Sequence, residues 1–170
     1  DPTAAQRVNR LVEQGIDWGF FLGAAISHQL GCLVYWNLNQ ACPDMVPEGL
    51  LQRLKAAYNQ NATRNLFMTA EACRILGIFR ERGIPAVSFK GPLQAAEIYG
   101  NLALREISDL YFLVHQKDVL PAKEALLAHG FRPYKIFSPE QERAHIHGYT
   151  QYDYPFISTG GKYMIELHWL

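Results

Sequence analysis

The spacing of apolar residues changes at Gly83, and this change constrains the fold more than any other feature of the sequence. From Glu48 to about Arg82, apolar residues recur every three or four positions, which predicts one long helix. After Gly83 the chain consists of short apolar runs separated by turn residues, a pattern typical of strands interleaved with helices. We therefore predict an α+β protein with a helical N-terminal region over 1–82 and a mixed β-sheet flanked by helices over 83–170.

The second half of the chain contains the candidate strands and the helices between them. We predict strands over Ile84–Phe89, Asp109–Val114, Phe131–Phe137, Thr150–Ile157 and Lys162–Trp169, the last two forming a hairpin. Helices are predicted from Pro92 to Gly100, from Asp118 to His129, and after the capping-box sequence that begins at Ser138.

The segment from Trp18 to Trp36 is strongly apolar and about long enough to cross a bilayer. Ser27, His28 and Gln29 lie at its centre, however, where burial of polar groups in lipid is most costly. We therefore favour a buried core helix over a membrane span, and no membrane is expected among the partners of this chain.

The charge balance restricts the partners of the protein. The sequence of 170 residues has 16 Lys and Arg against 16 Asp and Glu, so its formal net charge is zero. A neutral chain has no general electrostatic attraction for nucleic acid or for anionic membranes. Nucleic acid is therefore not indicated as a partner, and any polyanion must be held by local groups.

Cysteine content and the start of the sequence indicate the compartment. Three cysteines, an odd number with no CxxC pair, argue against a disulfide framework and against a zinc cluster. The first residues also lack the basic start and apolar stretch of a secretory signal. We expect a cytoplasmic protein.

Two acidic residues lie on predicted strands. Side chains alternate along a strand, so Asp109 and Tyr111 share one face of the strand over 109–114, as Glu166 and His168 do on the last strand. Carboxylates on neighbouring strands can converge on Mg²⁺, which usually takes one or two carboxylates and completes its shell with water and phosphate oxygens. In the alternative interpretation Asp109 caps a turn and Glu166 forms a surface salt bridge.

The junction at Lys90-Gly91 is a second candidate feature. It lies between a predicted strand and a predicted helix, where glycine allows close approach of a ligand and the free N–H groups of the helix favour phosphate. Lys90 adds a positive charge. The spacing of a Walker loop is absent, so an ordinary turn is the alternative.

Taken in order, these residues resemble a known family. The pattern consists of Gly83-Ile84-Pro85, Phe89-Lys90-Gly91-Pro92, Ile98-Tyr99-Gly100, Arg105, Ser108-Asp109-Leu110, Leu113-Val114, Asp118, Leu126-Leu127, Gly130-Phe131 and Ile165-Glu166-Leu167-His168-Trp169. It resembles the uncharacterised nucleotidyltransferase family of the polymerase-β-like nucleotidyltransferase superfamily over about 83–170. The preceding helical stretch resembles the N-terminal extension of that family.

The resemblance implies a reaction. Members of the superfamily hold Mg²⁺ with an acid pair, DxD, on one strand and a third acid on a neighbouring strand, and they transfer a nucleoside monophosphate from a nucleoside triphosphate (NTP) to an acceptor hydroxyl. By this resemblance Asp109 is the first acid and Glu166 the third, both catalytic and metal-binding. The acceptor, a small molecule or a protein, is unknown.

The resemblance also implies which residues contact the nucleotide. They all precede the first acid in sequence and are Lys90, Gly91, Arg105 and Ser108. His168 shares a face with Glu166 and is a candidate accessory residue; the alternative is a structural histidine. Family members usually continue beyond the last strand, so we expect part of the acceptor site to be missing from this sequence.

One position departs from the family pattern. The second acid of DxD falls at position 111, which holds Tyr111, and a phenol is a poor Mg²⁺ ligand at neutral pH. Neither Glu106 nor Asp118 can substitute, because both lie outside the strand. The alternative function is therefore a catalytically impaired nucleotide-binding or protein-interaction module. Either hypothesis requires Asp109 and Glu166 to lie on the same side of the sheet, close to each other and below Lys90.

Overall fold

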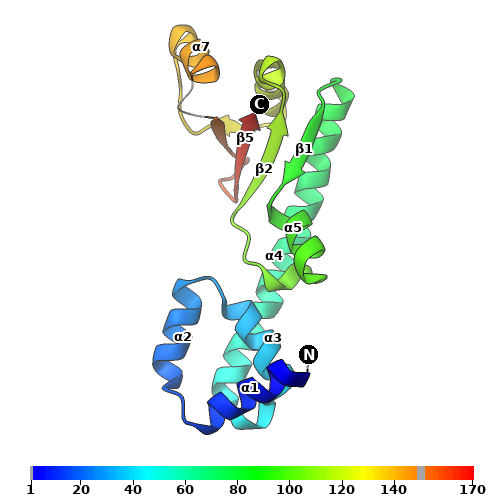
Figure 1. Cartoon of the computed structure of the whole chain (residues 1–170). Helices are drawn as coiled ribbons and strands as arrows, with labels where there is room; N and C mark the ends of the chain where they lie inside the picture. The colour runs from blue at the N-terminus through cyan, green and yellow to red at the C-terminus, as the bar shows by residue number, and fades with distance from the viewer. Residues whose placement is uncertain (1, 149–151) are drawn as a thin grey trace. The chain divides into compact units, whose positions relative to one another are not determined.

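The computed structural model describes residues 2–148 and 152–170 (Figure 1). The chain divides into two compact units. The helical unit contains the described residues up to Leu66 together with Ala95–Glu106, and the sheet unit contains Phe67–Gln94 and the described part of Ile107–Leu170. The proposal of separate domains over 1–82 and 83–170 stays a prediction, because compactness alone does not say which segments fold independently.

The helical unit packs its helices around a small apolar core. Its elements are α1 (Pro2–Glu13), α2 (Trp18–Ser27), α3 (Gly31–Ala41), the 3-10 helices η1 (Pro43–Met45) and η2 (Leu102–Leu104), the first part of α4 (Glu48–Glu81) and the last part of α5 (Gly91–Tyr99). The core consists of Tyr35, Leu38, Cys42, Val46 and Leu54. The 34-residue α4 confirms the long helix predicted from the apolar spacing before Gly83.

The segment Trp18–Trp36 is not the single helix that we predicted. Gln29 adopts a left-handed φ of 57° and ends α2, and Leu30 N donates a hydrogen bond of 2.8 Å to Ala25 O. This is the Schellman arrangement, which satisfies the last carbonyls of a helix and turns the chain away. A new helix then begins at Gly31.

The expected burial of this segment is also wrong for its first part. Among the residues of α2 only Ala25 is buried, and Phe20 is 79% exposed. Over the described residues, no helix is long and apolar enough to cross a membrane.

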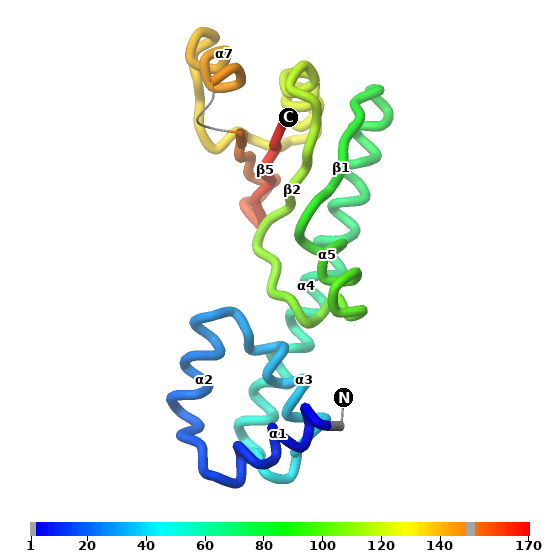
Figure 2. The backbone as a smooth tube through the Cα atoms, viewed as in Figure 1, coloured from blue at the N-terminus to red at the C-terminus, as the bar shows by residue number. Residues whose placement is uncertain are grey.

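The sheet unit is built on a five-stranded sheet, counted over its described residues. The strands are β1 (Ala86–Phe89), β2 (Asp109–Val114), β3 (Arg132–Pro133), β4 (Asp153–Ile157) and β5 (Met164–Trp169), in the order β1-β2-β5-β4-β3. β2 and β5 pair in parallel, and the other neighbours pair antiparallel. Figure 2 shows how the chain leaves β2 and returns beside it in β5. The α+β fold with a mixed sheet is therefore confirmed.

Helices and one 3-10 helix precede or connect the strands of this unit. They are the second part of α4, the first part of α5, η3 (Gln116–Asp118), α6 (Val119–Ala128) and α7 (Pro139–His147). Ser138 and Gln141 form the predicted capping box at the start of α7, with Ser138 Oγ accepting from Gln141 N at 3.2 Å.

The strand predicted over Phe131–Phe137 is only two residues long, as β3. Pro133 has no N–H to donate, and its partner strand contains Pro155, which has none either. After one further bond, from Tyr134 N to Pro155 O at 2.9 Å, the ladder ends. Residues 150 and 151 of the predicted strand over Thr150–Ile157 lie outside the described residues; the remainder forms β4.

The two faces of the sheet have different environments. One face is the core of the unit, with Leu110, Phe112, Val114, Ile165, Leu167 and Trp169 all buried. On this face the ring of Phe79 from α4 meets the ring of Phe112 edge-on, with centroids 5.8 Å apart. The alternate residues of β2 and β5 are half-buried and lie on the opposite face, which we call the open face.

Candidate functional site

The register of β2 and β5 places both predicted acids on the open face. Tyr111 lies opposite Glu166, and Asp109 lies opposite Met164, two residues before Glu166. From the strand spacing and the rise per residue, the Cα atoms of Asp109 and Glu166 are about 8 Å apart. The two acids are thus diagonal neighbours on adjacent strands, and carboxylates at such positions can reach one ion.

Tyr111 interacts directly with the first acid. Its hydroxyl donates a hydrogen bond of 2.6 Å to Asp109 Oδ2, and Ser108 Oγ donates one of 2.9 Å to Asp109 Oδ1. Both carboxylate oxygens of Asp109 therefore accept a hydrogen bond from a neighbouring hydroxyl group. The position where the family pattern has a second metal-binding acid holds a hydrogen-bond donor instead.

The turn after β1 brings Lys90 to the same face. Lys90 and Gly91 both have left-handed φ angles, 60° and 59°, and a left-handed lysine costs about 1–2 kcal/mol. A Cβ atom built on Gly91 would lie 3.8 Å from Asp109 O, so the turn runs along the start of β2. Lys90 Nζ lies 4.2 Å from the centroid of the Tyr111 ring. This strained turn therefore holds a cation beside Tyr111, next to the first acid.

Glu166 is hydrogen-bonded to the candidate accessory residue. His168 Nε2 lies 3.0 Å from Glu166 Oε2, and the two side chains are 23% and 28% exposed. The His168 ring also contacts Phe89 and Tyr111, with centroid distances of 5.3 and 5.8 Å. Residues from three neighbouring strands thus form one continuous cluster around the acids.

Arg105 belongs to the helical unit, whereas Lys90, Gly91, Ser108, Asp109, Glu166 and His168 belong to the sheet unit. Two asparagines on α4 bind the backbone of Arg105: its carbonyl accepts from Asn61 Nδ2 at 3.0 Å and from Asn65 Nδ2 at 2.7 Å. Sequence reasoning missed both asparagines. Their spacing of four residues on the inward side of a helix is the signal that could have identified them.

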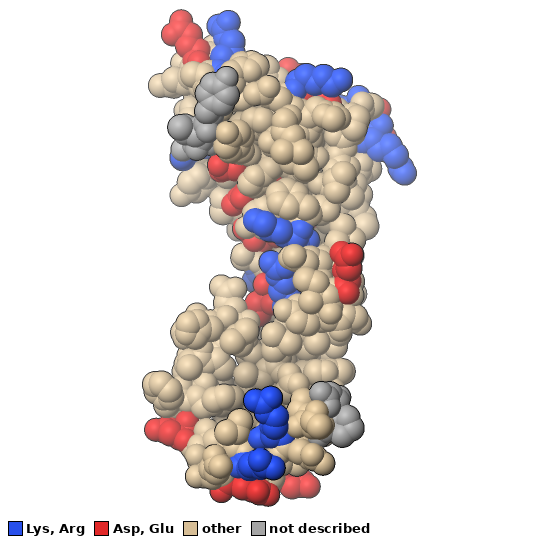
Figure 3. All heavy atoms as spheres, viewed as in Figure 1, with Lys and Arg blue, Asp and Glu red and all other residues tan. Residues whose placement is uncertain are grey.

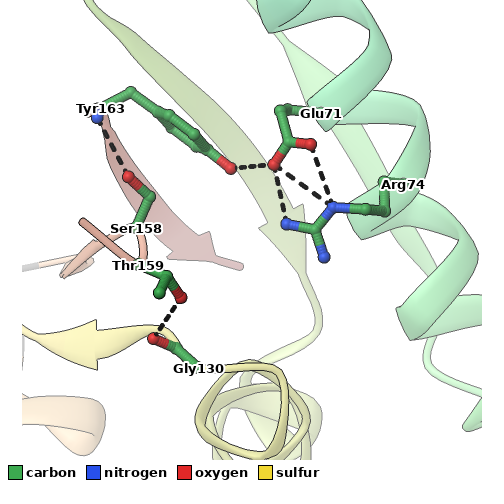
Figure 4. Close-up of polar contacts among 6 residues, drawn as sticks. All are labelled: Glu71, Arg74, Gly130, Ser158, Thr159 and Tyr163. Carbon is green, nitrogen blue, oxygen red and sulfur yellow. Dashed lines mark hydrogen bonds and ion pairs between the residues drawn. The ribbon is translucent and has the colours of Figure 1, made fainter. Parts of the chain in front are cut away.

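A hydrogen-bonded group of side chains links α4 to the start of β5 (Figure 4). The Tyr163 hydroxyl, three residues before Glu166, donates to Glu71 Oε2, and Arg74 Nη2 binds the same oxygen at 2.7 Å. The hydrogen bonds from Arg74 hold the pKa of Glu71 below its ordinary value; burial opposes this effect and Tyr163 supports it. Burial and the contact with Glu71 raise the pKa of Tyr163. These contacts hold in place the start of β5, the strand that carries Glu166.

The loop between β4 and β5 is also anchored, as Figure 4 shows. Tyr163 N donates to Ser158 Oγ at 3.1 Å, and Thr159 Oγ1 donates to Gly130 O at 2.9 Å. The loop that leads from β4 into β5 therefore has a defined conformation.

The donors fit a single Mg²⁺ ion better than a pair. Among the described residues, no three His, Cys, Asp or Glu side chains are grouped so as to hold a metal. Asp109 and Glu166 provide two carboxylates, which is sufficient for one Mg²⁺ whose remaining ligands are water and phosphate oxygens. A second ion would need a further acid where Tyr111 donates a hydrogen bond.

Surface charge gives no broad attraction for a polyanion on the face drawn in Figure 3. Lys and Arg side chains are interspersed there with Asp and Glu over a mostly uncharged surface. A phosphate group bound on the face that is drawn would therefore depend on individual basic residues.

A mixed sheet that carries acids on an open face, beside a Lys-Gly turn leading into a helix, is the arrangement expected of a nucleotidyltransferase. A sequence model of the uncharacterised nucleotidyltransferase family matches residues 14–170, and the chain belongs to that family. The match also includes most of the helical stretch, in agreement with its resemblance to the N-terminal extension of the family. No curated protein matches the chain.

Proposed function

We propose that this protein binds a nucleoside triphosphate with Mg²⁺ and transfers its nucleoside monophosphate to an acceptor hydroxyl, with release of pyrophosphate. One observation carries the proposal. Asp109 and Glu166 lie on one face of adjacent parallel strands, beside the Lys90-Gly91 turn, in a member of a nucleotidyltransferase family. The predicted cytoplasmic location is part of this proposal.

The phosphates would lie at the turn after β1. The first N–H groups of α5 have no partners within the helix and favour an anion, and the ammonium group of Lys90 supplies positive charge. Ser108 is the other proposed phosphate contact of the sheet unit, and the role of Arg105 in the helical unit stays a prediction from the sequence. In the transition state, negative charge is distributed over the oxygens of the transferred phosphoryl group. These residues would therefore act mainly by positioning the phosphates and by stabilising this charge.

Asp109 and Glu166 would hold the metal. A bound Mg²⁺ would neutralise phosphate charge and make the α-phosphorus easier to attack. Tyr111 and Ser108 orient the Asp109 carboxylate, and His168 orients that of Glu166. The protein thereby presents both carboxylates in fixed positions before the nucleotide binds.

A second candidate function follows from Tyr111. The Tyr111 hydroxyl donates a hydrogen bond to Asp109 Oδ2, and β2 carries no second acid. The site therefore favours binding of the nucleotide over rapid transfer of its nucleoside monophosphate. In this alternative the protein binds Mg·NTP and acts as a nucleotide-binding or protein-interaction module.

The test measures binding and transfer separately. Thermal unfolding with each NTP, with and without Mg²⁺, reports binding, because a ligand that binds only the folded state raises Tm. Transfer of α-³²P-labelled nucleotide to any acceptor, with pyrophosphate release, reports catalysis. Asp109→Asn and Glu166→Gln should abolish the Mg²⁺-dependent shift, whereas Glu124→Gln, at an exposed position on α6, should not. A shift without transfer supports the second function, and no shift with any NTP contradicts both.

A further inference from the structure

A cavity of about 510 Å³ opens on the sheet beside the acids. It is lined by Phe89, Leu113, Gln116, Tyr152, His168, Trp169 and Leu170. None of these lining residues is Lys, Arg, Asp or Glu. Pockets of this size and apolar character typically bind small molecules.

The cavity shares walls with the candidate site. His168 lines it and is hydrogen-bonded to Glu166. Phe89 lines it and contacts the ring of Tyr111, with centroids 5.7 Å apart, and Tyr111 in turn binds Asp109. The cavity therefore borders the acids without being lined by them.

Hydrogen bonds hold two of the lining residues, Gln116 and Leu170, in place. Gln116 N donates to Leu170 O at 3.2 Å, and Leu170 N donates to Val114 O at 3.4 Å. The Gln116 side chain is held by a bond of 2.8 Å from its Nε2 to Ile146 O. These contacts make the cavity a preformed feature of the sheet unit.

We propose that this cavity binds the acceptor, an uncharged and mostly apolar or aromatic molecule that presents a hydroxyl group to the acids. The inference rests on the proposed nucleotidyl transfer and names its second substrate by chemical class. A charged acceptor is disfavoured, because no Lys, Arg, Asp or Glu side chain lines the cavity.

The in-line geometry of nucleotidyl transfer supports the assignment of the cavity to the acceptor. Along the open face of β2 the order is Asp109 beside the Lys90-Gly91 turn, then Tyr111, then Leu113 at the cavity. Attacking and leaving oxygens lie roughly in line in phosphoryl transfer. With pyrophosphate leaving on the side of the lysine turn, the hydroxyl must approach from the opposite side, where the cavity lies.

The step balances without a further reactant. The acceptor oxygen forms a bond to the α-phosphorus, and the bond from that phosphorus to the pyrophosphate oxygen breaks. The hydroxyl proton passes to solvent water, and pyrophosphate leaves with the electron pair of the broken bond.

The experiment uses 2-naphthol, a fluorescent and uncharged aromatic alcohol, as the probe, and MgATP as the nucleotide. We expect saturable binding of 2-naphthol to the full chain and simultaneous binding of MgATP. Leu113→Lys places a charge in the cavity and should weaken 2-naphthol binding roughly tenfold or more, with the Kd for MgATP unchanged. Leu127→Lys, on α6 and 40% exposed, is the matched control and should change neither.

A second variant covers the case in which Leu113→Lys does not fold. Tyr152 is 51% exposed, so Tyr152→Ala should leave the fold intact and weaken only 2-naphthol binding. Competition between 2-naphthol and MgATP would assign the cavity to the nucleobase and overturn the proposal, as would binding that neither variant affects. Failure of every Mg·NTP, including MgATP, to bind the wild type would contradict the proposed function instead, since 2-naphthol binding is measured independently of the nucleotide.

Discussion

The Tyr111 hydroxyl donates a hydrogen bond of 2.6 Å to the carboxylate of Asp109 two residues earlier on the same strand. The two side chains share the open face of β2, and Glu166 lies opposite Tyr111 on β5. A residue that binds the first acid thus occupies the place of the second acid of the family pattern. In the proposed function, this pair decides between nucleotidyl transfer and nucleotide binding alone.

Restoring the acid is the first prediction. Tyr111→Asp should raise Mg²⁺-dependent pyrophosphate release by roughly tenfold or more, because a third carboxylate beside Asp109 and Glu166 adds a metal ligand at the site of charge development. The measurement is pyrophosphate release against Mg²⁺ concentration. Tyr111→Phe removes the hydroxyl without adding an acid and should give no increase. A reverted protein that neither binds Mg·NTP nor turns over faster would remove the support for a catalytic site here.

The second prediction concerns the cation beside Tyr111. Lys90→Met keeps the length of the side chain but removes its charge, so NTP binding should weaken roughly tenfold through loss of one charge-assisted contact. Titration calorimetry with Mg·NTP measures the change. Lys117→Met, at an exposed position of the same unit, should leave Kd unaltered. Equal affinity of the two variants would place the phosphates elsewhere.

The third prediction concerns the asparagines of α4. Asn65 is fully buried and binds the carbonyls of Leu102 and Arg105, at 2.5 and 2.7 Å. Asn65→Ala leaves buried acceptors without this donor and should lower the free energy of unfolding by about 1–3 kcal/mol. Urea unfolding measures it, with the exposed Asn59→Ala as control. If Asn65→Ala lowers the free energy of unfolding no more than Asn59→Ala does, other contacts hold the segment that contains Leu102 and Arg105.

The fourth prediction is a pH dependence of stability. The pKa of Glu71 in the folded protein is below its ordinary value of 4.5, so its stabilising effect is complete above pH 4.5 and is lost as the pH falls through the folded pKa. Urea unfolding between pH 6 and about pH 3 should therefore show a decline that is smaller in Glu71→Gln. Glu124→Gln, which is exposed on α6, should retain the wild-type decline. Identical declines in all three proteins would contradict the assignment.

Local patterns predicted much of the fold. Asp109–Val114 is a strand with the predicted bounds, and the capping box at Ser138 forms as its sequence indicated. The break at Gln29 was missed because a glutamine in the left-handed region has no sequence signal comparable to glycine. The short β3 was missed because its length depends on Pro155 in a distant partner strand.

The candidate site was only partly predictable. Alternation along each strand showed which residues share a face, but the pairing of Tyr111 with Glu166 depends on the register between strands far apart in sequence. The position of Lys90 beside Tyr111 depends likewise on two successive left-handed residues, of which only Gly91 is a typical one. The cavity is defined by segments from β1, β2 and β5 together, so no local pattern indicates it.

The parallel pairing of β2 with β5 has a consequence for biosynthesis. Asp109 and its partner Met164 are 55 residues apart in the chain (164 minus 109). On a ribosome, β2 therefore emerges long before the strand that completes its hydrogen bonding, and the antiparallel β1 is its only early neighbour among the described strands. Contacts at such separation form late and slowly. A nascent chain thus carries the Asp109 half of the site, without Glu166, until β5 has also emerged from the ribosome.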